Sequence, residues 1–307
     1  MATMKHGFII AFLFLIPKLA KADSFGNFTY QNGAFTTLSV PAQDYPVGID
    51  NAGDVLMGEG NGTIIVNGNT VTSLNIPGEI TVLPLAISPN GTVLGRAINF
   101  TSTYFSETQG TVTFYPSAPG FLNGVNDNGQ FVGTTFDVQK NFIYDAKTGV
   151  VTNVANSTFL VSINDHGTVL GIATDRSNFI YNAGVFTTLA LPIGCRATAM
   201  NDNGAVVGNC LQGNELEGFV DQNGKVTYLN YVAPNNGDVF DTNITGINDS
   251  GEITGSFTNV PEPGSLLLLG VGIASLALAA LQKRIRILGL ILPQPTTYPA
   301  AAAAHRS

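Results

Sequence analysis

The sequence predicts an all-β protein of six four-stranded repeats, which we expect to form a six-bladed β-propeller, followed by one C-terminal transmembrane helix. Three observations predict this. A turn motif recurs six times, a second hairpin pattern recurs between its copies, and the composition suits short strands joined by tight turns. The 307 residues include 35 glycines, no tryptophan and only 11 % charged side chains. We expect one repetitive domain over residues 23–258.

The turn motif organises the chain. Its last copy is Gly-Ile-Asn-Asp-Ser-Gly at residues 246–251. The glycines that close the six copies are Gly53, Gly91, Gly129, Gly167, Gly204 and Gly251. Successive glycines lie 38, 38, 38, 37 and 47 residues apart. Such a period is typical of repeats that stack on their neighbours, and the longer last interval predicts an inserted loop at residues 230–242.

Each copy of the motif predicts a type I turn with a G1 bulge. Pro89 holds the second position in copy two, where its fixed φ suits a type I turn. The Asn, Asp or Ser at the first position bonds the backbone ahead, and the closing glycine takes the left-handed conformation. Apolar, β-branched runs flank each turn, so each turn joins the two strands of a hairpin.

A second hairpin pattern lies about 18 residues before each turn motif. It has an aromatic strand, a polar turn and a Thr-rich strand, as at residues 28–33 and 179–184, and is degenerate at residues 63–68 and 103–110. Two hairpins per period give the four strands of one propeller blade. The alternative is an open β-solenoid or a stack of hairpins, although closure into a ring would protect the edge strands. The repeats resemble the HAF family of extracellular bacterial repeats, whose core is Gly-Ile-Asn-x-x-Gly-x-Val-Val-Gly.

The charge of the predicted domain argues against nucleic-acid binding. Between Asp23 and Val260 there are 20 acidic and 6 basic residues, a net charge of −14. Such a surface repels phosphate backbones.

Residues 1–22 have the features of a secretory signal peptide. Lys5 and His6 give a positive start, residues 7–16 form an apolar run, and residues 20–22, Ala-Lys-Ala, match a cleavage site. The apolar run is too short to span a bilayer, so we expect cleavage rather than an uncleaved anchor.

The C-terminal region predicts a membrane anchor with a sorting signal. Val-Pro-Glu-Pro-Gly at residues 260–264 precedes an apolar stretch at residues 265–281 and then a basic cluster. A helix of this length is just long enough for a thin hydrocarbon core, and the basic cluster would stay cytoplasmic, so the repeat domain lies outside. Residues 259–286 resemble the PEP-CTERM sorting signal of Gram-negative bacteria.

This resemblance implies processing by an exosortase, a membrane protease-transpeptidase that recognises Pro-Glu-Pro and removes the helix. The matching positions here are the recognition residues Pro261, Glu262 and Pro263 and the basic stop Lys283, Arg284 and Arg286. Residues 265–281 would be a transient anchor in the inner membrane, with a permanent tail anchor as the alternative. Residues 287–307 extend beyond the usual end of the family's signal, and we expect a disordered tail there.

Cys195 and Cys210 lie on the two arms of the turn that ends at Gly204. A two-residue turn would place them directly opposite each other, and a G1 bulge would put them one residue out of register. Both arrangements keep them near the distance that a disulfide needs. Because an exported chain meets an oxidising compartment, we expect a disulfide, with two buried thiols as the alternative.

The polar residues give little support to an enzyme. His166 is the only histidine of the predicted mature domain, and it occupies a turn position held elsewhere by Asn or Ser. The four turn aspartates are explained by local hydrogen bonding; they are Asp127, Asp165, Asp202 and Asp249. Repetition does not explain two further acidic pairs, Glu215 with Glu217 and Asp238 with Asp241.

We therefore expect a non-catalytic binding or scaffolding protein at the cell surface or in the extracellular matrix. Its expected partners are the secretion machinery, an exosortase and extracellular polysaccharide. The alternative is a secreted carbohydrate-active hydrolase or lyase that uses one of the unexplained acidic pairs. We expect no metal or cofactor. Turns such as residues 126–128 offer oxygen ligands for Ca²⁺, but none has the spacing of a twelve-residue calcium loop.

Overall fold

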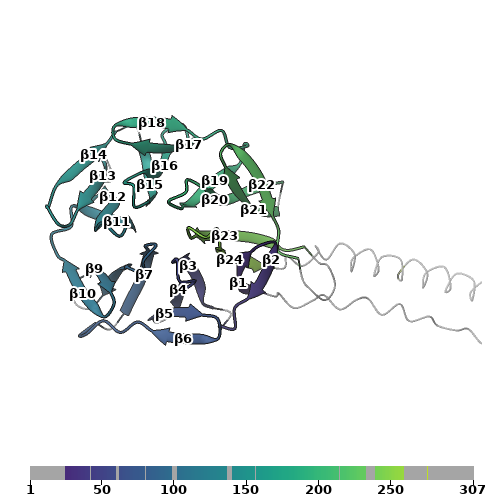
Figure 1. Cartoon of the computed structure of the whole chain (residues 1–307), viewed down its shortest axis with the longest axis horizontal. Helices are drawn as coiled ribbons and strands as arrows, with labels where there is room; N and C mark the ends of the chain where they lie inside the picture. The colour runs from purple at the N-terminus through teal and green to yellow at the C-terminus, as the bar shows by residue number, and fades with distance from the viewer. Residues whose placement is uncertain are drawn as a thin grey trace, which may run out of the picture. The chain divides into compact units, whose positions relative to one another are not determined.

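The fold is a closed ring of six four-stranded antiparallel sheets, which confirms the predicted six-bladed β-propeller (Figure 1). The computed structural model describes residues 25–41, 43–59, 62–79, 81–98, 102–136, 140–155, 157–213, 215–232 and 239–258, together with Ser275. Apart from Ser275, the described residues fall in the compact unit Asp23–Val260. No helix in this part of the chain is long and apolar enough to cross a membrane.

In blades 1 to 5 the strands run in chain order from the innermost to the outermost. Blade 1 contains β3 (Tyr45–Ile49), β4 (Val55–Glu59), β5 (Gly62–Asn67) and β6 (Thr70–Ser73). Blade 2 contains β7 (Thr81–Ile87), β8 (Val93–Ile98), β9 (Ser102–Thr108) and β10 (Thr111–Tyr115). Blade 3 contains β11 (Gly120–Val125), β12 (Gln130–Thr135), β13 (Asn141–Asp145) and β14 (Val151–Val154). Blade 4 contains β15 (Ser157–Ile163), β16 (Val169–Ala173), β17 (Asn178–Asn182) and β18 (Val185–Thr188). Blade 5 contains β19 (Cys195–Met200), β20 (Val206–Gln212), β21 (Glu215–Gln222) and β22 (Lys225–Leu229).

Blade 6 closes the ring by joining the two ends of the domain. It contains β23 (Asp241–Ile247) and β24 (Ile253–Thr258), and then β1 (Phe25–Gln31) and β2 (Ala34–Thr37). β1 pairs with β24 from Phe25 opposite Thr258 to Tyr30 opposite Ile253. The sequence repeat and the blade are therefore out of phase. Each aromatic hairpin belongs to the blade of the turn motif before it, and the first one completes the last blade.

The six turns have the geometry that Pro89 predicts. In each copy the amide of the closing glycine donates to the carbonyl of the first turn residue, as from Gly204 to Asn201 at 3.2 Å. The first residue's amide donates across the turn to the residue after the glycine. All six closing glycines have φ between 73° and 84°, the left-handed region that a G1 bulge requires.

A second bulge in the innermost hairpins restores the register that the turn bulge shifts. In blade 5 it lies between Ala197 and Ala199, so Cys195 pairs directly with Cys210. These two cysteines form a disulfide, and both are buried. The bulge in the turn and direct cysteine pairing, which are alternatives when the turn alone sets the register, therefore coexist.

The core lies between neighbouring blades and depends on repeated glycine–phenylalanine pairs. A Cβ added to Gly171 would lie 2.3 Å from the Phe179 ring, and one added to Gly255 would lie 2.8 Å from the Phe28 ring. Both phenylalanines pair directly with their glycine on the adjacent strand. In blade 1, Met57 stands at the glycine position and Ile64 at the phenylalanine position. Methionine is larger than glycine, and isoleucine is smaller than phenylalanine. This exchange explains why the aromatic pattern is degenerate there.

The insertion predicted at residues 230–242 lies between β22 and β23 and contributes to the core. Tyr231 and Phe240 are buried, and the Tyr231 ring stacks on Phe257 with the centroids 3.8 Å apart. Phe28 also packs against Tyr231, at 6.0 Å. The extra residues therefore seal blade 6, where the ring closes.

Candidate functional site

The propeller has two different faces, and the turn face repeats more regularly than the loop face. The turn face is the end of the strands where all six turn motifs lie. The loop face is the opposite end, where the connections between blades and the entries into the innermost strands lie. Those connections vary from two residues between β14 and β15 to eleven between β22 and β23. A site specific to this protein is therefore expected on the loop face.

On the turn face, asparagine side chains link each blade to the next. The Nδ2 of Asn126 donates to the carbonyl of Asn164 at 2.9 Å, and the Oδ1 of Asn126 caps its own turn. The same bond runs from Asn164 to Asn201, from Asn201 to Asn248 and from Asn248 to Asp50. Asparagine suits this position because one side chain supplies both an acceptor and a donor.

The turn aspartates take part in the same ring. Among the described residues, the hydrogen bonds that their carboxylates accept come from a neighbouring blade rather than from their own turn, so the prediction of local hydrogen bonding was wrong. The carboxylate of Asp165 accepts from the amide of Asp127 at 2.8 Å, and that of Asp202 accepts from the amide of Asp165 at 2.8 Å. Asp249 accepts from Asp202 and donates its own amide to Asn51. Ser88 donates to Asp127, and the amide of Asn51 reaches the carbonyl of Pro89, which completes the six interfaces. These polar residues have structural roles.

Burial, together with the neighbouring carboxylates, raises the pKa of Asp165 to about 7. Burial is the largest cause, followed by the hydrogen bond with the Asp127 carboxyl, and the charges of Asp127 and Asp202 add to it. The folded chain therefore holds this proton more tightly than the unfolded chain, in which the pKa lies near 3.8. Between about pH 4 and pH 7 the unfolded chain releases this proton and the folded chain keeps it. The free energy of unfolding therefore falls as pH rises through this range.

We predict that Asp165→Asn removes this pH dependence. The amide keeps the acceptor for the Asp127 backbone and carries no charge. The melting temperature of the wild type relative to that of the variant should therefore fall as pH is raised from about 4 to about 7 and level off above. Thermal unfolding across this range measures it, and parallel curves for the two proteins would contradict the assigned pKa.

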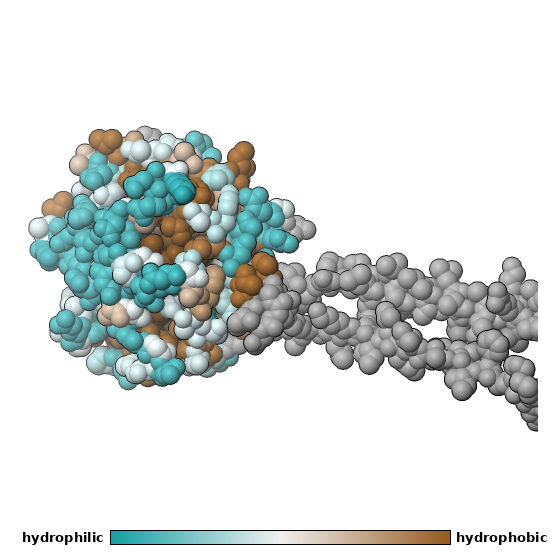
Figure 2. Space-filling model, turned by 45° about the vertical axis from the view of Figure 1, so that its right-hand side comes forward, coloured by the Kyte–Doolittle hydropathy of each residue, from teal (hydrophilic) through white to brown (hydrophobic). Residues whose placement is uncertain are grey.

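The axis of the ring holds a cavity of about 100 Å³. Its wall includes the six bulged residues of the innermost strands, which are Val47, Leu85, Asn123, Val161, Thr198 and Thr245. In an oblique view, hydrophobic side chains gather in the middle of the ring and hydrophilic ones border them (Figure 2). No charged side chain comes from these bulges. Asp249 also lines the cavity, and its carboxylate accepts hydrogen bonds from Asn51 and Asp202 in the ring of the turn face.

The loop face exposes aromatic side chains at one repeated position. Tyr45, Phe121 and Phe159 lie eight residues before their closing glycines and are 47 %, 41 % and 42 % exposed. Phe136 is 61 % exposed, and its ring lies 5.2 Å from the Phe121 ring at 78°. These aromatic residues carry no reactive group and belong to neither recurring motif, so they were not among the predicted site residues. The aromatic residue at the start of three innermost strands was the available signal.

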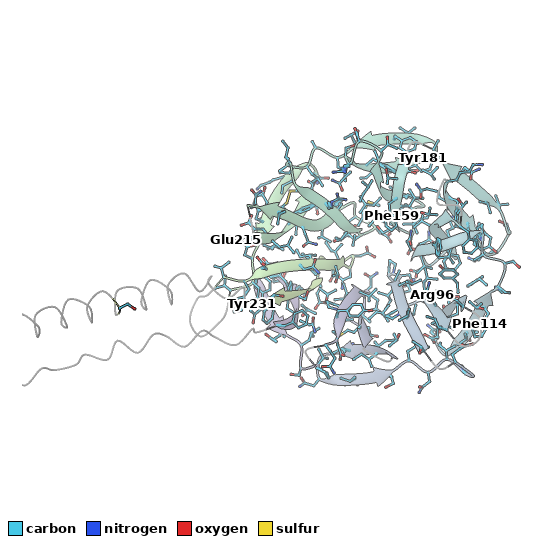
Figure 3. The ribbon with its side chains drawn as sticks, turned by 180° about the vertical axis from the view of Figure 1, so that it is seen from behind. Arg96, Phe114, Phe159, Tyr181, Glu215 and Tyr231 are labelled. Atoms are coloured by element: carbon cyan, nitrogen blue, oxygen red, sulfur yellow. A yellow bond between two sulfur atoms is a disulfide. The ribbon has the colours of Figure 1, made fainter. Side chains whose placement is uncertain are left out.

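The acids that repetition does not explain lie around blades 5 and 6. Glu215 is exposed at the start of β21, whereas Glu217 accepts a hydrogen bond from Asn230 at 3.0 Å. Asp241 accepts from the backbone amide of Leu216 at 2.9 Å, and Asp238 lies outside the described residues. Arg96, Phe159 and Glu215 come from three different blades around the ring (Figure 3). Two of the three described acids therefore hold loop-face backbone and side chains in place.

Metal-ligating groups do not gather in the part of the chain that the structure describes, where no three His, Cys, Asp or Glu side chains could hold one ion. His166 is an exposed turn residue whose amide donates to Asn164. The sorting residues lie outside the described ranges; they are Pro261, Glu262, Pro263, Lys283, Arg284 and Arg286.

The fold defines a six-bladed propeller, and the family comparison adds a sorting signal. The model of the PEP-CTERM protein-sorting motif matches residues 259–284. This motif implies an exported, membrane-anchored precursor that an exosortase sorts. No curated protein matches the chain.

Three solved structures are similar to this chain at low identity. The crystal structure of the Myceliophteria thermophila Cps50 (Swd1) β-propeller domain is 12 % identical with a TM-score of 0.40, over 72 % of this chain and 98 % of that one. The β-propeller domain of the Trilobed protease from Pyrococcus furiosus is 12 % identical with a TM-score of 0.38, over 62 % and 73 %. The extracellular domain of a putative hybrid two-component system from B. thetaiotaomicron is 10 % identical with a TM-score of 0.38, over 76 % and 40 %.

Proposed function

We propose that this chain is an exported propeller that binds extracellular polysaccharide and catalyses no reaction. A secretory signal peptide at residues 1–22 starts its export, and exosortase cleavage then frees it from its anchor for the cell surface or the extracellular matrix. The resemblance of the repeats to the extracellular HAF family supports this setting.

The observation that carries the binding part is the difference between the two faces. The polar turn residues are occupied in the ring of hydrogen bonds, whereas the loop face leaves Tyr45, Phe121 and Phe159 half-exposed at equivalent positions. Spaced aromatic rings suit a polymer of sugar rings, because the apolar C–H face of each sugar can be buried against them. The structural contacts of Glu217 and Asp241 support a role without catalysis.

Sorting predicts the covalent state of the protein outside the cell. The extracellular form should lack residues 265–286 by mass spectrometry, because exosortase processing removes the helix. Changing Pro261, Glu262 and Pro263 to alanine should hold the uncleaved chain in the membrane fraction, whereas Glu215→Gln, a control outside the motif, should be processed normally. An extracellular protein that still carries residues 265–286 would refute the sorting step.

The binding part is tested by co-sedimentation of the propeller, residues 23–260, with extracellular polymer from the producing cells. All six blades and the closure lie within residues 25–258, so this fragment contains the complete ring. The wild type should sediment with the polymer, and its failure to do so would refute the proposal.

A further inference from the structure

We propose that the gap between blades 2 and 3 on the loop face binds an acidic sugar, with Arg96 holding its carboxylate and Phe121 and Phe136 contacting its ring. This inference rests on the proposed polysaccharide binding and names the sugar class and the site.

The gap occurs where a repeated contact between blades is absent. At four interfaces, the residue before the core Phe or Ile of the third strand donates a side-chain hydrogen bond to a backbone carbonyl of the next blade. The pairs are Asn27 to Asp44, Thr63 to Val82, Asn141 to Ser157 and Asn178 to Cys195, at 2.9, 3.1, 2.7 and 3.1 Å. Between blades 5 and 6, Asn209 bonds both the carbonyl and the amide of Ile244.

Blade 2 places Tyr104 at this linking position, opposite Arg96 on the adjacent strand. Among the described residues, no hydrogen bond from Tyr104 or Arg96 to blade 3 replaces the missing one. A cavity of about 210 Å³ lies there instead, of the order of one sugar ring rather than a drug-sized ligand. The other blades hold Gly58, Thr134, Ile172, Asn209 and Ser256 at the position of Arg96.

Arg96 requires an acceptor that the described residues do not supply. Its Nε is buried and has no hydrogen-bond partner. None of the described residues that line the cavity is acidic. A buried donor without a partner is costly, and a guanidinium fork matches a carboxylate in particular. An anionic group in the cavity would satisfy it.

The rest of the lining favours a sugar ring over a small inorganic anion. Phe121 comes from β11, Phe136 directly follows β12, and both are exposed aromatic residues of the cavity lining. Tyr104 and Tyr115 also line it, as do Ser102 and Thr103, whose hydroxyls can bond sugar hydroxyls. The lining provides apolar contact, neutral hydrogen bonding and one positive charge, which matches a single hexuronate unit. The domain's net charge of −14 disfavours a densely charged polyanion, whereas Arg96 meets one carboxylate locally inside the cavity.

Calorimetric titration of the propeller, residues 23–260, with trigalacturonate and with its neutral trimethyl ester tests the site. The acidic sugar should bind at least about tenfold more tightly, since one charge-assisted hydrogen bond distinguishes the two. Arg96→Gln should remove that preference, while Arg196→Gln, which changes a cation on blade 5, should keep it. Phe121→Ala should weaken binding of both sugars by about tenfold or more, and Phe186→Ala, an equally exposed phenylalanine on the outer strand of blade 4, should not.

Retained melting temperatures identify variants whose fold is intact. Equal affinity of the wild type for the two sugars, no binding of trigalacturonate at about millimolar concentration, or full binding by Arg96→Gln would overturn the site. Co-sedimentation with native polymer distinguishes failure of the acidic-sugar site from failure of polysaccharide binding as a whole. A wild type that sediments with polymer but does not bind trigalacturonate refutes only the acidic-sugar site, whereas a wild type that does not sediment refutes the proposed function itself.

Discussion

Phe28→Ala is expected to lower the free energy of unfolding by about 3–5 kcal/mol, the range for removing a fully buried phenylalanine. The Phe28 side chain is 0 % exposed. Its ring lies over Gly255, and it packs 5.1 Å from Phe35 and 6.0 Å from Tyr231. Gly255 has no side chain with which to fill the cavity, so little relaxation is available. The residue also joins β1 to β24, so the loss falls on the closure of the ring.

Urea unfolding of the propeller measures this effect, with Phe114→Ala as the matched control. Phe114 is a phenylalanine on the outer strand of blade 2 and is 41 % exposed, so its loss should be much smaller. If Phe28→Ala does not fold, Phe28→Leu should still fold with a smaller loss. Similar losses at Phe28 and Phe114 would mean that ring closure does not depend on this aromatic cluster.

Reducing the Cys195–Cys210 disulfide is expected to lower the free energy of unfolding by about 3 kcal/mol. The bond closes a loop with a sequence separation of 15, and the entropy that such a cross-link removes from the unfolded chain corresponds to about this amount. Both cysteines are buried, so reduction should follow opening of blade 5 rather than precede it.

The measurement is the urea midpoint with and without dithiothreitol. The double variant Cys195→Ala and Cys210→Ala should show no effect of the reductant and should resemble the reduced wild type. Thiol labelling shows whether the reductant has broken the bond. If the bond is broken and the urea midpoint of the wild type is unchanged, the prediction is wrong.

The fold could be predicted because the residues of the turn motif and the period of the repeat indicate the same arrangement of hairpins. Pro89 defined the turn type for all six copies, and the period gave the blade content. The sequence could not show which two hairpins share a blade. By its period alone, an aromatic hairpin could pair with the turn-motif hairpin before it or with the one after it. Contacts between Phe28 and Gly255, far apart in sequence, decide it. The inserted residues were expected to form only a loop, yet Tyr231 and Phe240 enter the core, because burial does not follow from length.

Most residues of the candidate site could not be predicted, because they come together only in the folded ring. Repetition correctly explained the turn aspartates as structural, but their hydrogen bonds to neighbouring blades depend on the closed ring. Arg96 and Phe121 lie on different blades and belong to no motif, so only the structure brings them to one cavity. What marks the site is a departure from the repeat, with Tyr104 where four other blades hold Asn or Thr.

The central claim is that the propeller binds extracellular polysaccharide and does not cleave it. Incubation of residues 23–260 with polymer from the producing cells, followed by assay of the bound protein and of released reducing ends, tests both halves at once. We predict retention on the polymer with no reducing ends above those of a protein-free control. Reducing ends that increase with protein concentration and disappear in Glu215→Gln or Glu217→Gln would contradict the claim and establish a hydrolase.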